Sequence, residues 1–249
     1  MAKLSVIIIT KNEEDNIRAC LESVAWANEI VVVDSASSDG TVNISKALGA
    51  QVHTTTDWPG FGAQKNRALS HATCEWVLSL DADERVTPEL RTEIEAALND
   101  PQEHAAFRIP RLSSFCGRYM HHSGWYPDYV TRLFRRGMAK FSDDLVHESL
   151  IVNGMVGKLG QSLLHNTFHD LDELLVKINQ YSTAGAQMLS EKNKTATLRK
   201  AVGHALWAFF RTYIIRAGFL DGREGFMLAV STAESAYYRY AKLMLLNKR

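Results

Sequence analysis

The stretch LSVIIITKNEE, residues 4–14, sets the pattern for the whole fold because it joins a strand directly to the start of a helix. Residues 4–9 are almost all apolar and largely β-branched, which is typical of a parallel strand covered on both faces. Glu13 and Glu14 suit the first turn of a helix, because its N-terminus attracts carboxylates. The apolar residues after them repeat with helical spacing: Ile17, Cys20, Leu21 and Val24. We therefore expect a buried strand followed by an amphipathic helix.

The same alternation continues over about the first 100 residues. Further strands are expected at 30–33, 51–54 and 76–80, and further helices at 42–48, at 62–71 and from Pro88 onward. Gly49 fits the end of the second helix, and Thr87 fits the N-cap of the fourth. Alternating strands and helices predict an α/β fold, with a mostly parallel sheet sandwiched by helices.

Composition excludes several classes of protein. The chain has 249 residues, 46% apolar and 22% charged, so it can bury a large core. Its 28 basic and 28 acidic residues give zero net charge, so we expect no nucleic-acid partner, and any attraction to anionic lipid must be local. Three widely spaced cysteines fit reduced thiols in the cytoplasm. The apolar run at the N-terminus is too short for a signal peptide and fits a first strand instead.

Polar side chains follow three of the expected strands at the point where each one ends. They are Thr10, Asn12 and Glu13 after the first strand, Asp34 after the second, and Asp81 and Asp83 after the fourth. Ligands of such sheets bind outside the carboxyl ends of the strands, so these residues are candidates for a binding site. Each acid taken singly also fits a turn, a helix cap or a solvated loop. Carboxylates that lie close together repel each other and are costly to bury, so we expect them to be exposed to solvent, paired with basic residues or bound to a metal ion.

Four motifs carry a resemblance to a known family: SVIIITKNEEDNI, IVVVDSASSDGT, KNRAL and LSLDADE. In this order and spacing they resemble the family 2 glycosyltransferases, which implies the GT-A fold and a nucleotide-diphosphate-sugar donor. Four motifs in sequence are far more specific than one Asp-x-Asp. The later segments RLFRRG, VHE and LDGREGF are similar to the branch that adds sugars to the inner core of bacterial lipopolysaccharide.

The resemblance assigns the residues of a uridine-diphosphate-sugar site. The nucleotide-sugar residues it implies are Thr10, Asn12, Glu13, Asp34, Lys65 and Asp81. Asp34 would accept the uracil N3–H, Lys65 would lie near the base or the diphosphate, and Asp81 would face the ribose. Asp83 would bind Mg²⁺ or Mn²⁺ together with the phosphates, an arrangement that hard divalent cations favour.

The implied reaction inverts the anomeric centre of the donor sugar and needs a carboxylate base for the acceptor hydroxyl. Glu148 in DDLVHESL is the best match, with Asp144 next. Family members often carry Glu-Asp where this chain has His147-Glu148. A surface position for Glu148, before a strand, remains the alternative.

Residues 101–168 are expected to form the acceptor half of the catalytic domain, beside a nucleotide-sugar half at 1–100. Trp125 and Tyr126 could stack on sugar faces or pack in a core. The guanidinium forks of Arg132, Arg135 and Arg136 suit phosphate, although a solvated basic face is an equal alternative. His165 and His169 have i, i+4 spacing, but they lack the partners of a zinc signature, so we predict no zinc site.

Residues 169–249 are expected to form a helical extension of the 1–168 domain. Its first helix should start after Asp170, with Glu173 completing a capping box. A later helix has a broad apolar face with basic neighbours: Leu206, Phe209, Phe210, Tyr213, Ile214 and Ala217, beside Lys200, His204 and Arg211. Arg211 and Arg216 interrupt it too early for a membrane span. The helix therefore either lies in a membrane interface or packs on protein, including a second subunit.

These expectations combine into one hypothesis and two rivals. The hypothesis is an inverting enzyme that moves a hexose, glucose by preference, from a UDP-sugar to an inner-core sugar, in the cytoplasm or at the inner face of the membrane. One rival is a magnesium-dependent phosphatase or phosphotransferase with Asp81 as nucleophile, although Arg85 departs from that motif. The other is a nucleotide-sugar-binding scaffold without turnover.

Overall fold

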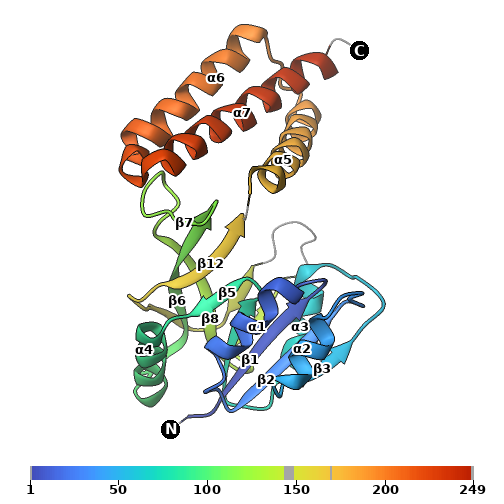
Figure 1. Ribbon diagram of the computed structural model, residues 1–249, viewed down its shortest axis with the longest axis vertical. Coiled ribbons are helices and arrows are strands. Elements are labelled where there is room, and N and C mark those ends of the chain that lie inside the picture. The colour runs from blue at the N-terminus through green and yellow to red at the C-terminus, as the bar shows by residue number, and fades with distance from the viewer. Residues whose placement is uncertain (1, 143–148, 169, 248–249) are drawn as a thin grey trace. The chain divides into compact units, whose positions relative to one another are not determined.

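The computed structural model describes residues 2–142, 149–168 and 170–247. The chain divides into two compact units (Figure 1). The first comprises Met1–Arg111 and Asp128–His165, and the second comprises Leu112–Pro127 and Asn166–Arg249.

The first unit begins with the alternation that the sequence predicts, and the α/β class is confirmed. Its strands are β1 (Leu4–Thr10), β2 (Glu29–Asp34), β3 (Gln51–Thr54) and β4 (Trp76–Asp81), and its helices are α1 (Glu14–Ser23), α2 (Thr41–Ala47), α3 (Phe61–His71) and α4 (Pro88–Asn99). The four strands are parallel neighbours in the order β3-β2-β1-β4. The Thr87 hydroxyl caps α4 by accepting a hydrogen bond from the backbone N–H of Leu90 at 3.1 Å, and Gly49 follows α2 with a φ of 82°.

Beyond β4 the sheet becomes mixed, which the sequence did not predict. Its further strands are β5 (Glu84–Val86), β6 (His104–Phe115), β8 (Asp128–Arg135) and β12 (Leu163–Phe168), in the order β4-β8-β6-β12-β5. Strand β8 runs antiparallel to both β4 and β6. Short strands complete the set: β7 (Arg118–Tyr119), β9 (Ala139–Phe141), β10 (Leu150–Val152) and β11 (Met155–Lys158).

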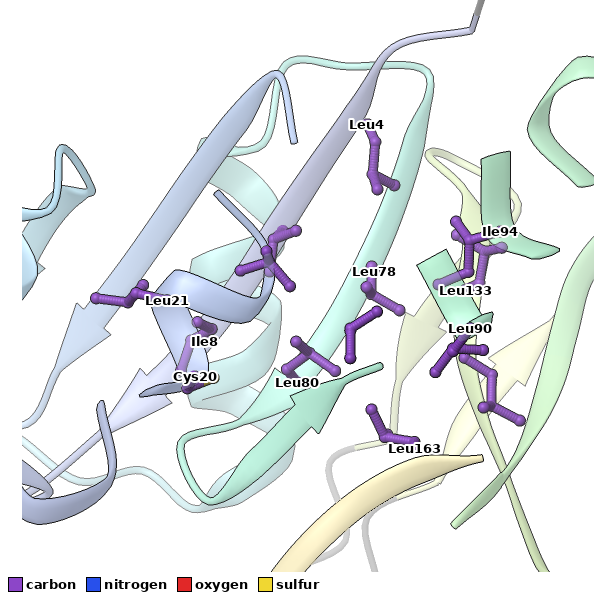
Figure 2. Close-up of a cluster of buried hydrophobic side chains, with 14 of the residues drawn as sticks. Leu4, Ile8, Cys20, Leu21, Leu78, Leu80, Leu90, Ile94, Leu133 and Leu163 are labelled. Carbon is purple, nitrogen blue, oxygen red and sulfur yellow. The ribbon is translucent and has the colours of Figure 1, made fainter. Parts of the chain in front are cut away.

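Alternate residues of the central strands enter two separate cores, which explains the nearly continuous apolar runs. Ile8 and Leu78 belong to a buried cluster with side chains of α1 and α4, such as Cys20 and Ile94 (Figure 2). Ile7, one residue from Ile8, lies in another cluster with residues of α3. Burying a leucine-sized side chain contributes about 1.5–3 kcal/mol, so these clusters hold β1 and β4 in place.

The second unit contains the C-terminal helices: α5 (Leu171–Glu191), α6 (Leu198–Phe210), a π-helical turn η1 (Arg211–Ile215), a 3₁₀ turn η2 (Gly218–Asp221) and α7 (Gly222–Leu246). Both α5 and α6 pack on α7. As predicted, the Asp170 carboxylate caps α5 by accepting from the backbone N–H of Glu173 at 2.9 Å. Among the helices that the structure describes, none combines the length and apolar character needed to cross a membrane.

The LDGREGF motif makes hydrogen bonds and close backbone contacts inside the second unit. The buried Asp221 carboxylate accepts hydrogen bonds from the backbone N–H groups of His121 at 3.2 Å and His122 at 3.0 Å. A Cβ on Gly225 would lie 1.9 Å from the carbonyl oxygen of Gly218, so only glycine fits there. In this structure the motif therefore fixes the loop at 121–123 to the start of α7.

Candidate functional site

The register of the parallel strands brings the predicted acids to one edge of the sheet. Thr10 pairs with Asp34 across β1 and β2, and Ile9 pairs with Asp81 across β1 and β4. Neighbouring parallel strands lie about 4.8 Å apart, so the ends of β2, β1 and β4 form one continuous rim. We call this rim, with the loops that follow these strands, the acidic edge.

Asp34 ties the first two loops of the acidic edge together. Its side chain is fully buried, and its Oδ1 accepts a hydrogen bond from the Thr10 hydroxyl at 3.1 Å. Oδ1 also accepts from the Ser37 hydroxyl, and Oδ2 accepts from the Ser37 backbone N–H at 2.9 Å. Each carboxylate oxygen offers two acceptor sites, so Oδ2 retains capacity for one more donor.

Asn12 and Glu13 extend this contact between the loops. Asn12 has a φ of 55°, and its Oδ1 accepts from the backbone N–H of Ser38 at 2.8 Å. The Glu13 backbone N–H donates to the Thr41 hydroxyl at 2.8 Å. Burial raises the pKa of the Glu13 carboxyl, and the negative charge of Asp83 adds to that effect. The loops after β1 and β2 are thus joined, and Glu13 lies within electrostatic range of Asp83.

Asp81 lies between two buried cations. Lys65 places its Nζ 3.0 Å from Asp81 Oδ1, and the Arg132 guanidinium bonds Asp81 Oδ2. Lys65 is 3% exposed and Arg132 is 7% exposed. Burial acts to raise the pKa of Asp81, but the charges of Arg132 and Lys65 outweigh it and hold that pKa below its usual range. Asp81 is therefore ionised at neutral pH.

The same arginine also serves a second acid, Glu84, which the sequence did not single out as buried. Arg132 Nη2 lies 2.7 Å from Glu84 Oε1, and Glu84 Oε2 accepts from the Asp81 backbone N–H at 2.9 Å. Burial raises the pKa of Glu84, the charge of Arg132 opposes this, and that of Asp81 adds to it. Arg111 continues the chain of charges, with 3.8 Å to Glu84 and 2.6 Å to Asp128. The sequence offered one signal that Glu84 is buried: in a strand over the residues ERV, Glu84 would lie on the same side as the apolar Val86.

Asp83 stands apart from this network, in the turn between β4 and β5. Its Oδ2 lies 3.3 Å from His165 Nε2, because β12 pairs with β5 and sets His165 opposite Glu84. Arg85 anchors the turn by donating to the carbonyl oxygens of Ala82 and Asn16, each at 2.8 Å. From the sequence, His165 and His169 were a packed or surface pair, and the Asp83 contact of His165 was missed; His169 lies outside the described residues.

Asp83 and His165 offer one carboxylate and one imidazole to a metal ion. Within the described residues no group of three or more His, Cys, Asp and Glu side chains is placed to hold a metal by itself. Such a pair fits a divalent cation whose other ligands are phosphate oxygens and water, which is how magnesium and related ions bind with nucleotides.

The other predicted site residues are not all brought to the acidic edge. Arg135 and Arg136 lie at the opposite edge, because antiparallel pairing sets Arg135 beside Trp76, at the start of β4. Arg135 places its guanidinium 5.2 Å from the centre of the Trp76 ring, and Arg136 Nε donates to the Cys74 carbonyl oxygen at 3.0 Å. Arg132, on the same strand, is occupied by Asp81 and Glu84.

The aromatic pair of the predicted acceptor region belongs to the second unit. Trp125 packs against Phe115 and Phe168, with ring centres 6.0 and 6.2 Å away. The Tyr126 ring lies 5.8 Å from that of His121. Glu148 and Asp144, the proposed bases, lie outside the described residues.

Comparison with known proteins agrees with this architecture. The sequence profile of glycosyl transferase family 2 matches residues 5–159. An uncharacterized glycosyltransferase of Rickettsia prowazekii is 32% identical over 98% of this chain and 87% of its own length. The lipopolysaccharide core biosynthesis glycosyltransferase LpsC of Rhizobium meliloti is 32% identical over 96% of this chain and 93% of its own.

A solved structure shares the fold at low sequence identity. It is S. aureus TarS 1-349 in complex with UDP-GlcNAc, with a TM-score of 0.52 and 16% identity over 99% of this chain and 91% of that one. The profile match and the two relatives establish the family independently of this fold. The chain is a glycosyltransferase with the GT-A fold, and it belongs to glycosyl transferase family 2.

Proposed function

We propose that the enzyme transfers a hexose, glucose, from a UDP-sugar to an inner-core sugar of lipopolysaccharide, with inversion at the anomeric carbon. The observation that carries the donor half is the alignment of Thr10, Asp34 and Asp81 at adjacent carboxyl ends of parallel strands. This is where sheets of this kind bind nucleotides. The acceptor half is supported by the Rhizobium meliloti relative, which is named for lipopolysaccharide core biosynthesis.

In this proposal the acidic edge binds the nucleotide. Asp34 Oδ2 uses its remaining acceptor site for the uracil N3–H, while the Thr10 hydroxyl and the Ser37 amide fix the carboxylate. Lys65 and Asp81, already paired, lie near the diphosphate and the ribose respectively. The TarS complex with UDP-GlcNAc supports a UDP-sugar as the donor class, because the two proteins share the fold. Asn12 and Glu13 shape the loop around the base.

A divalent cation, Mg²⁺ or Mn²⁺, would be held by Asp83, with His165 beside it. When bound, it supplies positive charge that stabilises the leaving diphosphate. The negative charge of Asp83 helps to raise the pKa of the Glu13 carboxyl, so a cation at Asp83 would relieve the repulsion between the two acids.

For the chemical step we propose Glu148 as the general base, with Asp144 as the second candidate. The carboxylate takes the proton of the acceptor hydroxyl while that oxygen attacks the anomeric carbon and the bond to UDP breaks. Attack from the face opposite the nucleotide inverts the anomeric configuration. A positioned base of this kind contributes about 10²- to 10⁴-fold to the rate.

We further propose that the second unit contacts the membrane that carries the acceptor. Nine large apolar side chains of α6, η1 and η2 are exposed: Leu198, Val202, Leu206, Trp207, Phe210, Ile214, Ile215, Phe219 and Leu220. We call them the α6–η2 apolar surface. Residues 192–220, which carry this surface, contain six lysines and arginines and no acid, so the segment is strongly basic. Apolar residues flanked by cations suit the interface of an anionic bilayer.

A calorimetric donor screen with and without Mn²⁺ tests the donor and metal parts together. We expect Mn²⁺-dependent binding of UDP-glucose that exceeds binding of other UDP-sugars. Equal binding of all nucleotides, or none, would contradict the proposed donor.

Transfer to isolated core oligosaccharide tests the chemical step. Glu148→Gln should lower the transfer rate by about 100-fold or more while UDP-glucose still binds. A wild-type enzyme that binds the donor but transfers to no core acceptor would contradict the acceptor and leave the donor assignment standing.

A further inference from the structure

The second unit contains a cavity of about 380 Å³ that the family assignment does not explain. Helix α7 contributes small polar lining residues such as Ser231 and Ser235, and α5 and the end of α6 contribute other lining residues. A volume of this size lies within the usual range for small-molecule sites.

Part of the lining of this cavity is apolar and buried. Leu174 from α5 and Leu228 from α7 are buried there, and Trp125 and Phe168 line it as well. These four side chains belong to the same hydrophobic cluster, so the floor of the cavity is a preformed part of the core. An aliphatic chain or the apolar face of a sugar would be covered well by it.

Three cations line the same cavity: Lys177, Arg211 and Arg239. No aspartate or glutamate is among the described residues that line it. Within the described ranges none of the three cations forms an ion pair with a carboxylate, in contrast to Lys65 and Arg132 of the first unit. Like charges around one cavity repel each other, and an anion that enters it removes that repulsion.

Arginine and lysine differ in what they offer to such an anion. The guanidinium groups of Arg211 and Arg239 present planar forks that match phosphate or carboxylate oxygens, while Lys177 adds a point charge. Arg239 packs over Gly185 of α5, where an added Cβ would lie 2.8 Å from Arg239 Nε. Gly185 therefore leaves room for this side chain beside α5.

We propose that this cavity binds an amphiphilic anion. Its phosphate or carboxylate would lie at Lys177, Arg211 and Arg239, and its apolar part would lie on Leu174, Leu228 and Trp125. The inference deepens the proposed function in one respect and rests on it there: an acidic, lipid-linked saccharide is the acceptor class with this chemistry. The binding site itself does not depend on that link.

Calorimetry with three probes tests the site without requiring turnover. Octyl phosphate, below its micelle concentration, should bind saturably and at least about tenfold more tightly than octyl glucoside, which lacks the charge. Inorganic phosphate should bind more weakly than octyl phosphate, because it cannot use the apolar floor. Equal affinity for the two octyl compounds would overturn the anion site, and equal affinity for the two phosphates would overturn the amphiphile.

Matched variants locate the site. The double variant Arg211→Gln and Arg239→Gln should weaken octyl phosphate binding by about tenfold or more. The control double variant Arg118→Gln and Arg223→Gln removes two exposed cations of the same unit that lie outside residues 192–220 and do not line the cavity, and it should bind as the wild type does. Equal weakening by both pairs would overturn the proposal in favour of general charge attraction.

UDP binding with Mn²⁺ separates this inference from the proposed function. The cavity variants should keep the wild-type affinity for UDP, because the acidic edge is intact. A protein that binds UDP-glucose but not octyl phosphate contradicts the cavity alone. A protein that binds octyl phosphate but no UDP-sugar contradicts the donor assignment alone.

Discussion

The acidic edge of the first unit and the cavity of the second differ in whether their cations are paired with carboxylates. At the acidic edge of the first unit, Arg132 and Lys65 are buried and each is bonded to a carboxylate. In the second unit, Arg211 and Arg239 are exposed and line a cavity with no acid among its described residues. Buried charges that are already paired hold the site in one conformation before a ligand arrives. Cations that have no carboxylate partner remain available to attract an anionic ligand.

The largest effect should come from breaking the pairing in the first unit. Arg132→Gln removes the cation that serves both Asp81 and the fully buried Glu84, so we expect a loss of about 3–5 kcal/mol in the free energy of unfolding. Denaturant unfolding measures it. The control is Arg18→Gln in α1, whose 3.7 Å pairing to Glu22 is exposed and should be worth about 1 kcal/mol or less. Similar losses in the two variants would contradict a special role for the pairing.

Asp83 distinguishes ligand binding from structure within the same edge. Asp83→Asn should lower the Mn²⁺-dependent affinity for UDP by about tenfold or more and the transfer rate by about 100-fold, because one charged ligand is lost. UDP binding without metal should change little. Asp100→Asn, at an exposed position after α4, is the control and should leave both quantities unchanged. An Asp83 variant with normal metal dependence would refute the proposed cation site.

The α6–η2 apolar surface tests the second unit. The double variant Trp207→Ser and Phe210→Ser should reduce binding to phosphatidylglycerol-containing vesicles by about tenfold or more, because two exposed rings no longer enter the interface. Vesicle co-sedimentation measures this. Trp58→Ser with Phe61→Ser removes an equally exposed aromatic pair of the first unit and serves as the control. The idea fails if both pairs act alike, or if neutral phosphatidylcholine vesicles bind the wild type equally well.

The smallest expected effect is on how the free energy of unfolding depends on pH in acidic solution. The folded-state pKa of Asp81 is lowered, so its contribution to stability is present above about pH 4 and is lost as the pH falls through the folded-state value. The raised pKa of Glu84 acts in the opposite direction, since the folded state takes up that proton more readily. The difference in unfolding free energy between wild type and Asp81→Asn should therefore narrow below about pH 4. A difference that stays constant with pH would show that Asp81 is not held ionised by its neighbours.

Sequence reasoning was most successful where structure depends on neighbours along the chain. The β1-α1 pattern, the Thr87 and Asp170 caps and the turn at Gly49 are local, and each is confirmed. The family resemblance and the GT-A fold are confirmed as well. Local propensity and periodicity need no knowledge of distant partners.

What the sequence did not predict depends on partners far apart in the chain. Arg132 meets Glu84 only because β8 is inserted beside β4, and His165 meets Asp83 only because β12 pairs with β5. Helical periodicity also placed Phe209 and Phe210 on one face. In the structure Phe209 packs against Phe226 of α7, with ring centres 5.7 Å apart, while Phe210 is exposed. Periodicity shows that a face is apolar, but it does not show what covers it.

The clamp between Asp221 and the loop at 121–123 bears on the order in which the protein can be completed during synthesis. The backbone amides of His121 and His122 find their acceptor on a residue that the ribosome adds about a hundred positions later. Until Asp221 has been made, these two amides can hydrogen-bond only to water, so the loop cannot form its final contacts before η2 has been synthesised. The loop at 121–123, although made early, therefore acquires these two hydrogen bonds only when the chain is nearly finished.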